Sequence, residues 1–292
     1  MSSKKLRLDV LLHQRGLFPS REAARRAVMA GLVKHEDEVL DKPGQQVHED
    51  ISISVDKPLH PYVGRGGLKL EKALFVFAVD LTGRIVVDVG ASTGGFTDCA
   101  LQHGASHVYA VDVGYGQLAW KLRSDERVTV MERTNFRHVD AHVFHPRPSV
   151  AVMDVSFISV GLLFPKLLEV LETPLDIISL VKPQFEAGRA DVGKGGIVRD
   201  RSVHKRVLHE HRAMGESNGL HLCGFTYSPV TGGDGNIEYL AWWQDVPPDG
   251  PIPGPPRQVH HAQVPQTDVD RVVEAAWNSL LEQGNTAPEA ES

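Results

Sequence analysis

The chain has 292 residues, enough for one large domain and a small one, and its apolar content of 41% is ordinary for a globular protein. A formal net charge of −6 excludes a protein coated in basic surface, and two cysteines exclude a disulfide framework or a cysteine-rich zinc site. No apolar run is as long as a membrane span, and the first residues lack a signal-peptide core, so we expect a cytoplasmic protein with no membrane partner.

The basic residues are concentrated near the N-terminus. Between residues 4 and 34 there are eight lysines and arginines but only two acidic residues. A local basic patch on a mildly acidic chain is typical of one module that binds a polyanion, because lysine and arginine neutralise phosphate groups. We therefore predict that phosphates are contacted by Lys4, Lys5, Arg7, Arg21, Arg25 and Arg26.

The apolar pattern of residues 6–57 predicts a small α+β domain. Leucines at positions 8, 11 and 12 indicate a helix that stops at Gly16, and a second helix is predicted from the N-cap Ser20 to Gly31. Short strands are expected at 32–33, 38–40 and 51–53.

Prolines and glycines in residues 58–66 indicate a linker, and residues 67–245 then alternate between strand and helix patterns. Such alternation predicts an α/β fold with a Rossmann-like, doubly wound sheet of seven strands. The proline-rich residues 246–292 predict a disordered tail, in which Val269 to Ala276 suits one short helix. Strands of the sheet are expected at 85–87, 108–111, 128–131, 149–154, 176–181, 221–228 and 237–243, and helices at 68–77, 160–172 and 202–217.

A glycine-rich turn follows the first strand of this sheet. Residues 88–97 read Asp-Val-Gly-Ala-Ser-Thr-Gly-Gly-Phe-Thr and lead into a helix whose first N–H groups are free to bind a ligand. Ligands of open α/β sheets bind at such a crevice. Asp112 ends the next strand, about 20 residues beyond the glycines, where an acid typically binds ribose hydroxyls. The residues alone leave two ligands open, a nicotinamide dinucleotide and S-adenosylmethionine.

Four ionisable residues stand where a doubly wound sheet places its working groups. Asp154 and Lys182 end strands, Glu238 opens the last strand, and Lys69 lies at the start of the domain. A buried lysine is costly unless it is paired, so spacing alone suits a structural ion-pair network and a reactive site equally well. Beside S-adenosylmethionine, one lysine could remove the proton from a ribose hydroxyl during methyl transfer, without a metal. The carboxylates and the second lysine would hold this base in place.

Two resemblances narrow these alternatives. Residues 6–57 resemble the small RNA-binding module of a ribosomal protein and of several RNA-modifying enzymes, through Arg7-Leu8-Asp9, Ser20-Arg21-Glu22-Ala23 and Gly31-Leu32-Val33. Residues 6–243 resemble the TlyA family, ribosomal RNA cytidine-2′-O-methyltransferases with an FtsJ-like domain that are often called haemolysins. The motifs that carry the second resemblance are Tyr62 to Lys69, Asp88 to Thr97, Glu132 to Asn135, Asp154 to Phe157, Val181 to Phe185 and Gly232 to Glu238.

The TlyA resemblance implies a site, a partner and a cofactor. It implies ribosomal RNA or ribosomal subunits as the partner, no metal, and a catalytic tetrad of Lys69, Asp154, Lys182 and Glu238. It also implies that S-adenosylmethionine, with its ribose at Asp112, is bound by Asp88, Gly90, Ala91, Ser92, Gly94, Asp112, Asn135 and Asp154.

The rival functions have weaker signals. Amino-methylation of a base usually needs Asp/Asn-Pro-Pro-aromatic after the fourth strand, whereas Asp154 to Phe157 lacks both prolines. A base-carbon methyltransferase needs a positioned cysteine, and neither Cys99 nor Cys223 lies in a suitable loop. A nicotinamide oxidoreductase lacks an evident hydride-transfer site. From other classes, the alternatives are a membrane-lytic haemolysin and a non-catalytic ribosome-assembly factor that binds RNA, and neither accounts for the glycine turn together with the tetrad.

Overall fold

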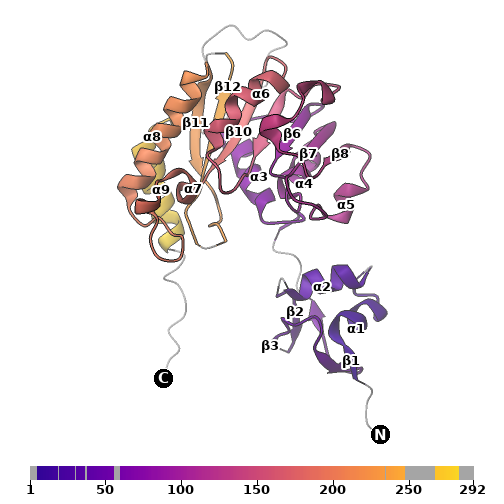
Figure 1. The fold of residues 1–292 in the computed structure, drawn as a ribbon. Helices are drawn as coiled ribbons and strands as arrows, with labels where there is room; N and C mark the ends of the chain where they lie inside the picture. Colours follow the sequence, from indigo (N-terminus) through magenta and orange to yellow (C-terminus); the bar gives the residue numbers. More distant parts are fainter. Residues whose placement is uncertain are drawn as a thin grey trace. The chain divides into compact units, whose positions relative to one another are not determined.

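The computed structural model describes residues 5–18, 20–29, 31–36, 38–55, 60–233, 235–246 and 267–282. Contacts divide the chain into two units, Met1–Pro61 and Tyr62–Ser292, and each unit is described by itself (Figure 1). Among the helices in these described ranges, none is both long and apolar enough to cross a bilayer.

The segment predicted as a linker, 58–66, falls partly inside the larger unit. The Tyr62 ring is buried and packs closely against Gly67, and the Val63 N–H donates to a carboxylate oxygen of Asp98 (2.9 Å). These contacts tie the chain to two helices, so the larger unit begins at Tyr62 and not at residue 67. Proline and glycine content, on which the linker prediction rested, carries no information about such side-chain contacts.

The smaller unit packs two helices against short strands. Leu8, Leu12, Val28 and Val33 are fully buried at its centre. The strands β1 and β4 form an antiparallel pair, and β3, β2 and β5 form an antiparallel sheet in that order. The elements of this unit are β1 (Lys5–Arg7), α1 (Leu8–Gln14), α2 (Arg21–Met29), β2 (Val33–His35), β3 (Glu38–Val39), β4 (Gln46–His48) and β5 (Ser54–Val55).

One strand of the smaller unit lies later in the chain than predicted. We expected a strand at 51–53, whereas the structure has β5 at Ser54–Val55. Side chains already bind the carbonyls of the expected strand. Arg15 donates to the Ile51 carbonyl (2.7 Å), and a ring nitrogen of His35 lies 2.8 Å from the Ser52 carbonyl. Carbonyls bound by side chains are satisfied without a neighbouring strand, so the ladder with β2 begins after them.

The larger unit is built on a sheet of seven strands, as predicted. The strand order is β11-β12-β10-β9-β6-β7-β8, in which β12 is antiparallel to both neighbours and the strands from β10 to β8 are parallel. The order reverses between β6 and β9, and ligands of such sheets bind at this switch point. The strands are β6 (Ile85–Val89), β7 (His107–Val111), β8 (Val128–Met131), β9 (Val150–Met153), β10 (Asp176–Val181), β11 (His221–Tyr227) and β12 (Tyr239–Gln244).

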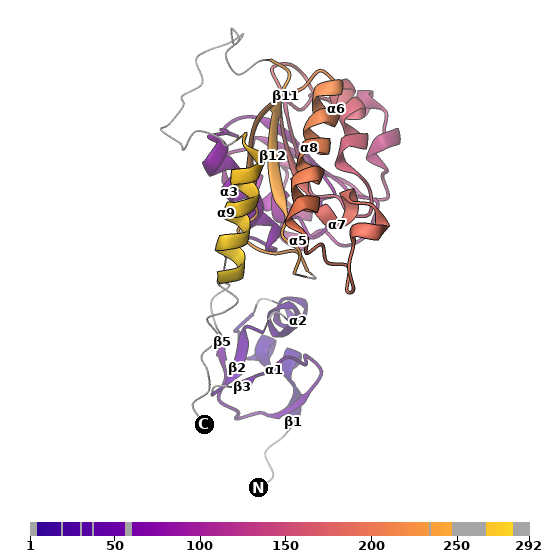
Figure 2. The same ribbon diagram turned by 90° about the vertical axis from the view of Figure 1, so that its left-hand side faces the viewer.

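Helices cover both faces of this sheet (Figure 2). Alternate strand residues point to opposite faces, so Val86 packs in a core with α3 and α4, and Val87 packs in a core with α6, α8 and α9. Because both faces are covered, the central strands read as nearly continuous apolar runs. The helices are α3 (Gly66–Phe77), α4 (Gly95–Gln102), α5 (Trp120–Arg123), α6 (Phe164–Val170), α7 (Pro183–Glu186), α8 (Arg201–Ser217) and α9 (Val269–Glu282), with short 3-10 turns at Phe136–His138, Ala141–Val143, Val160–Leu163 and Arg189–Asp191.

Helix α9 confirms the short helix predicted at Val269 to Ala276 within the tail 246–292, and it extends to Glu282. Its apolar stripe is buried against the face of the sheet that α8 also covers, and it contacts α8 and β11. A short helix with one apolar stripe is stable only when a partner covers the stripe, which the sequence pattern by itself cannot establish. Residues 247–266 and 283–292 of the predicted tail lie outside the described residues. The stripe consists of Val269, Val272, Val273 and Ala276.

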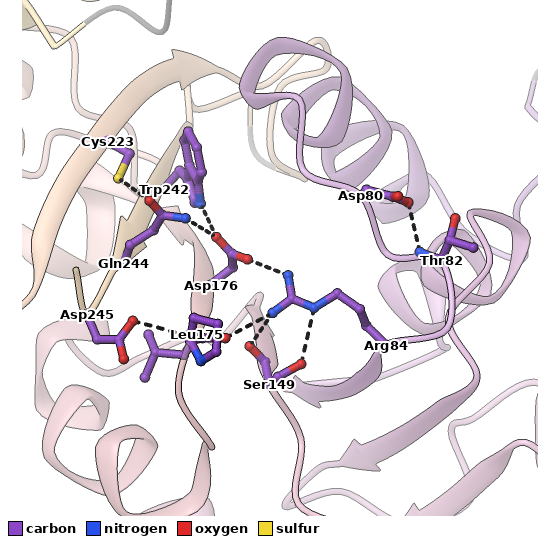
Figure 3. A network of polar contacts seen from close by, with 11 residues as sticks. Asp80, Thr82, Arg84, Ser149, Leu175, Asp176, Cys223, Trp242, Gln244 and Asp245 are labelled. Atoms are coloured by element: carbon purple, nitrogen blue, oxygen red, sulfur yellow. Dashed lines mark hydrogen bonds and ion pairs between the residues drawn. The ribbon is translucent and has the colours of Figure 1, made fainter. Parts of the chain in front are cut away.

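A buried polar network joins the strands at the end of the sheet that lies opposite the switch point (Figure 3). Asp176, which opens β10 and is 1% exposed, accepts hydrogen bonds from the side chains of Arg84, Trp242 and Gln244. Arg84 also donates to the hydroxyl of Ser149 (3.1 Å). These contacts join the starts of β6, β9 and β10 to the end of β12. The network therefore holds in register the same strands that carry the candidate site at their other ends.

Candidate active site

The glycine turn joins β6 to α4 at the switch point of the sheet. Gly90 has a φ of +87°, and Gly94, the N-cap of α4, has a φ of +96°, a region that residues with a Cβ rarely adopt. Space is equally restrictive, since a Cβ on Gly90 would lie 2.6 Å from the carbonyl oxygen of Asp154. The glycine therefore lets the turn pass directly against the chain that leaves β9.

A pocket of about 200 Å³ opens beside this turn. Its wall is made by the residues that lead into α3, by the turn and the start of α4, and by the loop after β9. Of the predicted cofactor-binding residues, Gly90, Ala91, Ser92 and Asp154 line the pocket. The other lining residues were not predicted to bind the cofactor, although each lies within a quoted motif: Gly64, Arg65, Gly66, Thr93, Gly95, Phe96 and Ser156.

Two predicted acids lie close to the pocket without lining it. Asp88 is fully buried at the end of β6, where one carboxylate oxygen accepts from the Thr97 hydroxyl (2.6 Å) and the other has no partner among the described residues. Burial raises the pKa of Asp88 to about 7. Asp112 accepts the backbone N–H groups of Ser92 (2.8 Å) and Gly114 (2.6 Å). Asp112 thus holds the glycine turn from the neighbouring strand.

The remaining predicted cofactor-binding residues, Gly94 and Asn135, also lie outside the lining of the pocket. A Cβ on Gly94 would lie 2.2 Å from the side chain of Leu122, so the start of α4 packs tightly against Leu122. Asn135 is exposed, and its side-chain oxygen accepts the Arg137 N–H (3.1 Å) at the start of a 3-10 turn. The contacts of both residues in the structure are therefore local.

The four residues predicted as a catalytic tetrad form one chain of contacts. The Lys69 Nζ lies 2.6 Å from an Oε atom of Glu238 and 3.9 Å from Asp154 Oδ2, while Asp154 Oδ1 lies 2.6 Å from the Lys182 Nζ. Lys69, Lys182 and Glu238 are 8%, 7% and 2% exposed, so water screens these charges weakly. Asp154 is the shared member, because each of its oxygens faces a different lysine. Within the described ranges, no group of three or more His, Cys, Asp or Glu side chains could hold a metal ion.

The topology of the sheet brings these four side chains together. The strands β9 and β10 are parallel neighbours, so Asp154 and Lys182 leave the sheet side by side. The strand β12 runs antiparallel to β10 and pairs Tyr239 with Val181, so Glu238 enters the sheet next to Lys182. Lys69 reaches the same edge from the first turn of α3. Residues far apart in the sequence therefore share one edge of the sheet.

Ser156 is a contact of the tetrad that sequence reasoning missed. Its hydroxyl oxygen accepts a hydrogen bond from the Lys182 Nζ (2.9 Å). Phe157 follows with a φ of +66° and an exposed ring, whose centroid lies 4.9 Å from that of Phe185. A loop serine has many structural uses, so its position two residues after Asp154 was the only available signal.

The predicted phosphate-binding residues of the smaller unit differ in whether a nearby acid neutralises their charge. Arg7 donates two hydrogen bonds to Asp9 (3.0 and 2.9 Å), Arg21 donates to the same carboxylate (3.2 Å), and the bond from Arg7 lowers the pKa of Asp9. Lys5 and Arg25 are exposed and pair with no acid in the described part of the chain. Outside the described residues lie Lys4 and the side chain of Arg26.

Comparisons with known proteins cover both units. Residues 62–244 match the FtsJ-like methyltransferase family, and residues 6–50 match the S4 domain. The chain is 50% identical over 292 residues to YqxC of Bacillus subtilis strain 168, named as an rRNA methyltransferase, and the match covers 99% of this chain and 100% of YqxC. It is 41% identical over 241 residues to the 16S/23S rRNA (cytidine-2′-O)-methyltransferase TlyA of Mycobacterium tuberculosis, covering 82% of this chain and 90% of TlyA.

A solved structure from Streptococcus thermophilus, named as a hemolysin, is 44% identical to the chain. The match has a TM-score of 0.71 and covers 97% of this chain and 99% of that protein. The resemblance drawn from the motifs is thereby confirmed over almost the whole sequence. With an S4 domain and an FtsJ-like methyltransferase domain in one polypeptide, this chain belongs to the TlyA family of FtsJ-like methyltransferases.

Proposed function

We propose that this protein acts in the cytoplasm and transfers a methyl group from S-adenosylmethionine to the ribose 2′-hydroxyl of a cytidine in ribosomal RNA. The observation that carries the proposal is the buried chain of contacts from Glu238 through Lys69 and Asp154 to Lys182, beside the glycine-turn pocket. Asp154 belongs to both features, because it lines the pocket and pairs with Lys182. A methyl donor in the pocket and a base on Lys182 would therefore meet at one carboxylate.

The residues around the pocket fit S-adenosylmethionine. The turn leaves the backbone at Gly90 open to close approach, the first N–H groups of α4 have no partner within the helix, and Asp88 keeps one unpartnered oxygen among the described residues. The amino-acid part of the cofactor carries a carboxylate and an ammonium group, which suit a helix N-terminus and an acid. We propose that Gly90, Ala91, Ser92 and Asp154 contact the cofactor from the pocket wall. Asp88, Gly94 and Asp112 would support that wall from behind. Cofactor binding by Asn135 stays a prediction.

Lys182 is the base in the proposed reaction. S-adenosylmethionine supplies an electrophilic methyl group: the 2′-oxygen forms the new C–O bond, the C–S bond breaks, and its electron pair stays on sulfur. The hydroxyl proton passes to the Nζ of Lys182, which accepts it in its neutral form. Asp154 holds that nitrogen, and Lys69 with Glu238 balances the charge on the far side of Asp154. Alignment of the hydroxyl between base and methyl group supplies much of the rate.

The smaller unit supplies affinity for RNA in this proposal. It matches the S4 domain, and its exposed Lys5 and Arg25 are free to neutralise phosphates. Arg7 and Arg21 share the carboxylate of Asp9, so their positive charge is partly neutralised before RNA binds. We therefore expect Lys5 and Arg25 to contribute more to the salt dependence of binding than Arg7 and Arg21 do.

The buried charges argue against a protein that only binds RNA or lyses membranes. Taking two lysines and two acids out of water costs free energy, and a purely structural role could be filled by apolar residues of similar size. Such a cluster, placed beside a pocket with a glycine turn, is better explained by chemistry at that edge of the sheet. The name of TlyA supports the same reaction, and the names of YqxC and TlyA both support ribosomal RNA as the substrate.

Mass spectrometry of ribosomal RNA tests this function directly. Nucleosides from a strain with the gene and from a strain without it should differ by the loss of a 2′-O-methylcytidine. The modification should return when the wild-type gene is restored, but not when a Lys182→Met gene is supplied. An identical set of 2′-O-methylated nucleosides in both strains would show that ribose methylation is not the function.

A further inference from the structure

We propose that Ser156 holds the Nζ of the Lys182 base in place and is a positioning residue for methyl transfer. The inference rests on the proposed function and adds a member to the tetrad. It starts from the contacts of one nitrogen: the Lys182 Nζ forms an ion pair with Asp154 Oδ1 at 2.6 Å and donates to the Ser156 hydroxyl oxygen at 2.9 Å. Both acceptors lie in the loop after β9, so one segment holds the base from two directions.

Two contacts hold the Lys182 Nζ from different sides. Asp154 attracts it as the opposite charge, and the Ser156 hydroxyl oxygen accepts one of its N–H bonds. No further acceptor within hydrogen-bond distance of the Lys182 Nζ is present in the described part of the chain. The remaining side of the nitrogen is left for the substrate hydroxyl.

Asp154 by itself would not fix this position. An ion pair tolerates a range of directions, whereas a hydrogen bond is strong only when its hydrogen points at the acceptor. Ser156 therefore limits the sideways movement of Nζ, and displacement of a reacting group by about 1 Å can cost about 100-fold in rate.

The Ser156 hydroxyl is itself held by its surroundings. The next residue, Phe157, has a φ of +66°, which a bulky residue adopts only where the surrounding structure imposes it. The Phe157 ring contacts Phe185, which follows Lys182 by three residues on α7. The loop after β9 and the start of α7 are therefore tied together on both sides of the Ser156–Lys182 bond. Ser156 also lines the pocket, so this bond lies beside the place proposed for the methyl donor.

A change at position 156 leaves the charged groups of this edge in place, which are Asp154, Lys69 and Glu238. Removing the Ser156 hydroxyl should therefore lower the maximal rate while the affinity for S-adenosylmethionine stays the same. Damage to the loop, which also lines the pocket, would lower both the rate and the affinity for S-adenosylmethionine.

Single-turnover methylation by the full-length protein tests the inference. The substrates are saturating S-adenosylmethionine with a tritiated methyl group and ribosomal subunits from a strain that lacks the gene. Ser156→Ala removes the acceptor, and Ser156→Thr retains a hydroxyl. Ser159→Ala is the matched control, because the hydroxyl of Ser159 contacts the sulfur of Met214 and not the tetrad. Calorimetric titration with S-adenosylmethionine checks that each variant keeps its pocket.

We expect the maximal rate of Ser156→Ala to fall by about tenfold while its affinity for S-adenosylmethionine stays at the wild-type value, and Ser156→Thr to stay within about threefold of wild type. Ser159→Ala should behave as wild type. The inference is overturned if Ser156→Ala keeps its rate, if it loses affinity for S-adenosylmethionine as well, or if Ser156→Thr or Ser159→Ala loses as much activity. Failure of the proposed function looks different, because the wild-type protein would then transfer no methyl group to ribose.

Discussion

Replacing Lys69 by methionine should destabilise the larger unit through the carboxylate that it leaves behind. Glu238 is 2% exposed, and Lys69 is the only cation within 4.0 Å of it in the described part of the chain. Removing one partner of a buried ion pair costs about 3–5 kcal/mol, because the other charge stays buried without compensation. Each kcal/mol lowers the unfolding midpoint of a domain of this size by about 2–4 °C, so Lys69→Met should melt at least about 6 °C below wild type.

The double variant Lys69→Met/Glu238→Gln is the matched control. Glutamine keeps the shape of Glu238 without its charge, so most of the lost stability should return, to within about 2 kcal/mol of wild type. Urea unfolding of the full chain, followed by circular dichroism, gives the free energies for the complete double-mutant cycle. If Lys69→Met unfolds at the same urea concentration as wild type, Glu238 does not depend on Lys69 and the charge balance described for the tetrad is wrong.

Three further predictions follow from the turn, the buried acid and the basic unit. Gly90→Val should weaken binding of S-adenosylmethionine by more than about tenfold in calorimetric titration, since a side chain meets the Asp154 carbonyl and strains a positive φ, and normal binding would place the pocket elsewhere. Burial raises the pKa of Asp88 to about 7, above about 3.9 in the unfolded chain. The folded state therefore retains a proton that the unfolded state loses, and the contribution of Asp88 to stability falls as pH rises from about 4 to about 7. Asp88→Asn should make the free energy of urea unfolding differ less between pH 5 and pH 8 than in wild type, and an equal difference would contradict the burial argument. Replacing Lys5 and Arg25 together by alanine should weaken RNA binding and flatten its salt dependence by about two counterions, and an unchanged slope would assign the RNA contacts to the larger unit.

The larger unit could be predicted well because its signals are local and repeated. Unbroken apolar runs such as Ile85–Val87 identify strands buried on both faces, and the regular return of such runs predicts a parallel sheet. Once the sheet is known, polar residues at strand ends must share one edge. That geometric rule brought Asp154, Lys182 and Glu238 together before any contact was known, and the structure shows all three in one chain of contacts with Lys69.

The features that sequence reasoning missed depend on contacts without a periodic signal. The hydrogen bond from Lys182 to Ser156 lies beside an unusual backbone turn at Phe157, which no apolar pattern records. The use of Asp9 to bind both Arg7 and Arg21 changes the meaning of a basic cluster that charge counting treated as uniform. In each case a side chain satisfies a distant partner, and only the folded chain reveals that pairing.

The most direct test of the proposed mechanism is single-turnover 2′-O-methylation by variants of Lys182, with tritiated S-adenosylmethionine and undermethylated ribosomal subunits. Lys182→Met keeps length and apolar packing but removes the nitrogen, so it should lower the rate by about 10² to 10⁴ while affinity for the cofactor and for RNA changes little. Lys182→Arg should fail as well, because a guanidinium stays protonated at any working pH and cannot accept the hydroxyl proton. Near-normal methylation by Lys182→Arg would show that position 182 supplies only charge, and would contradict its assignment as the base.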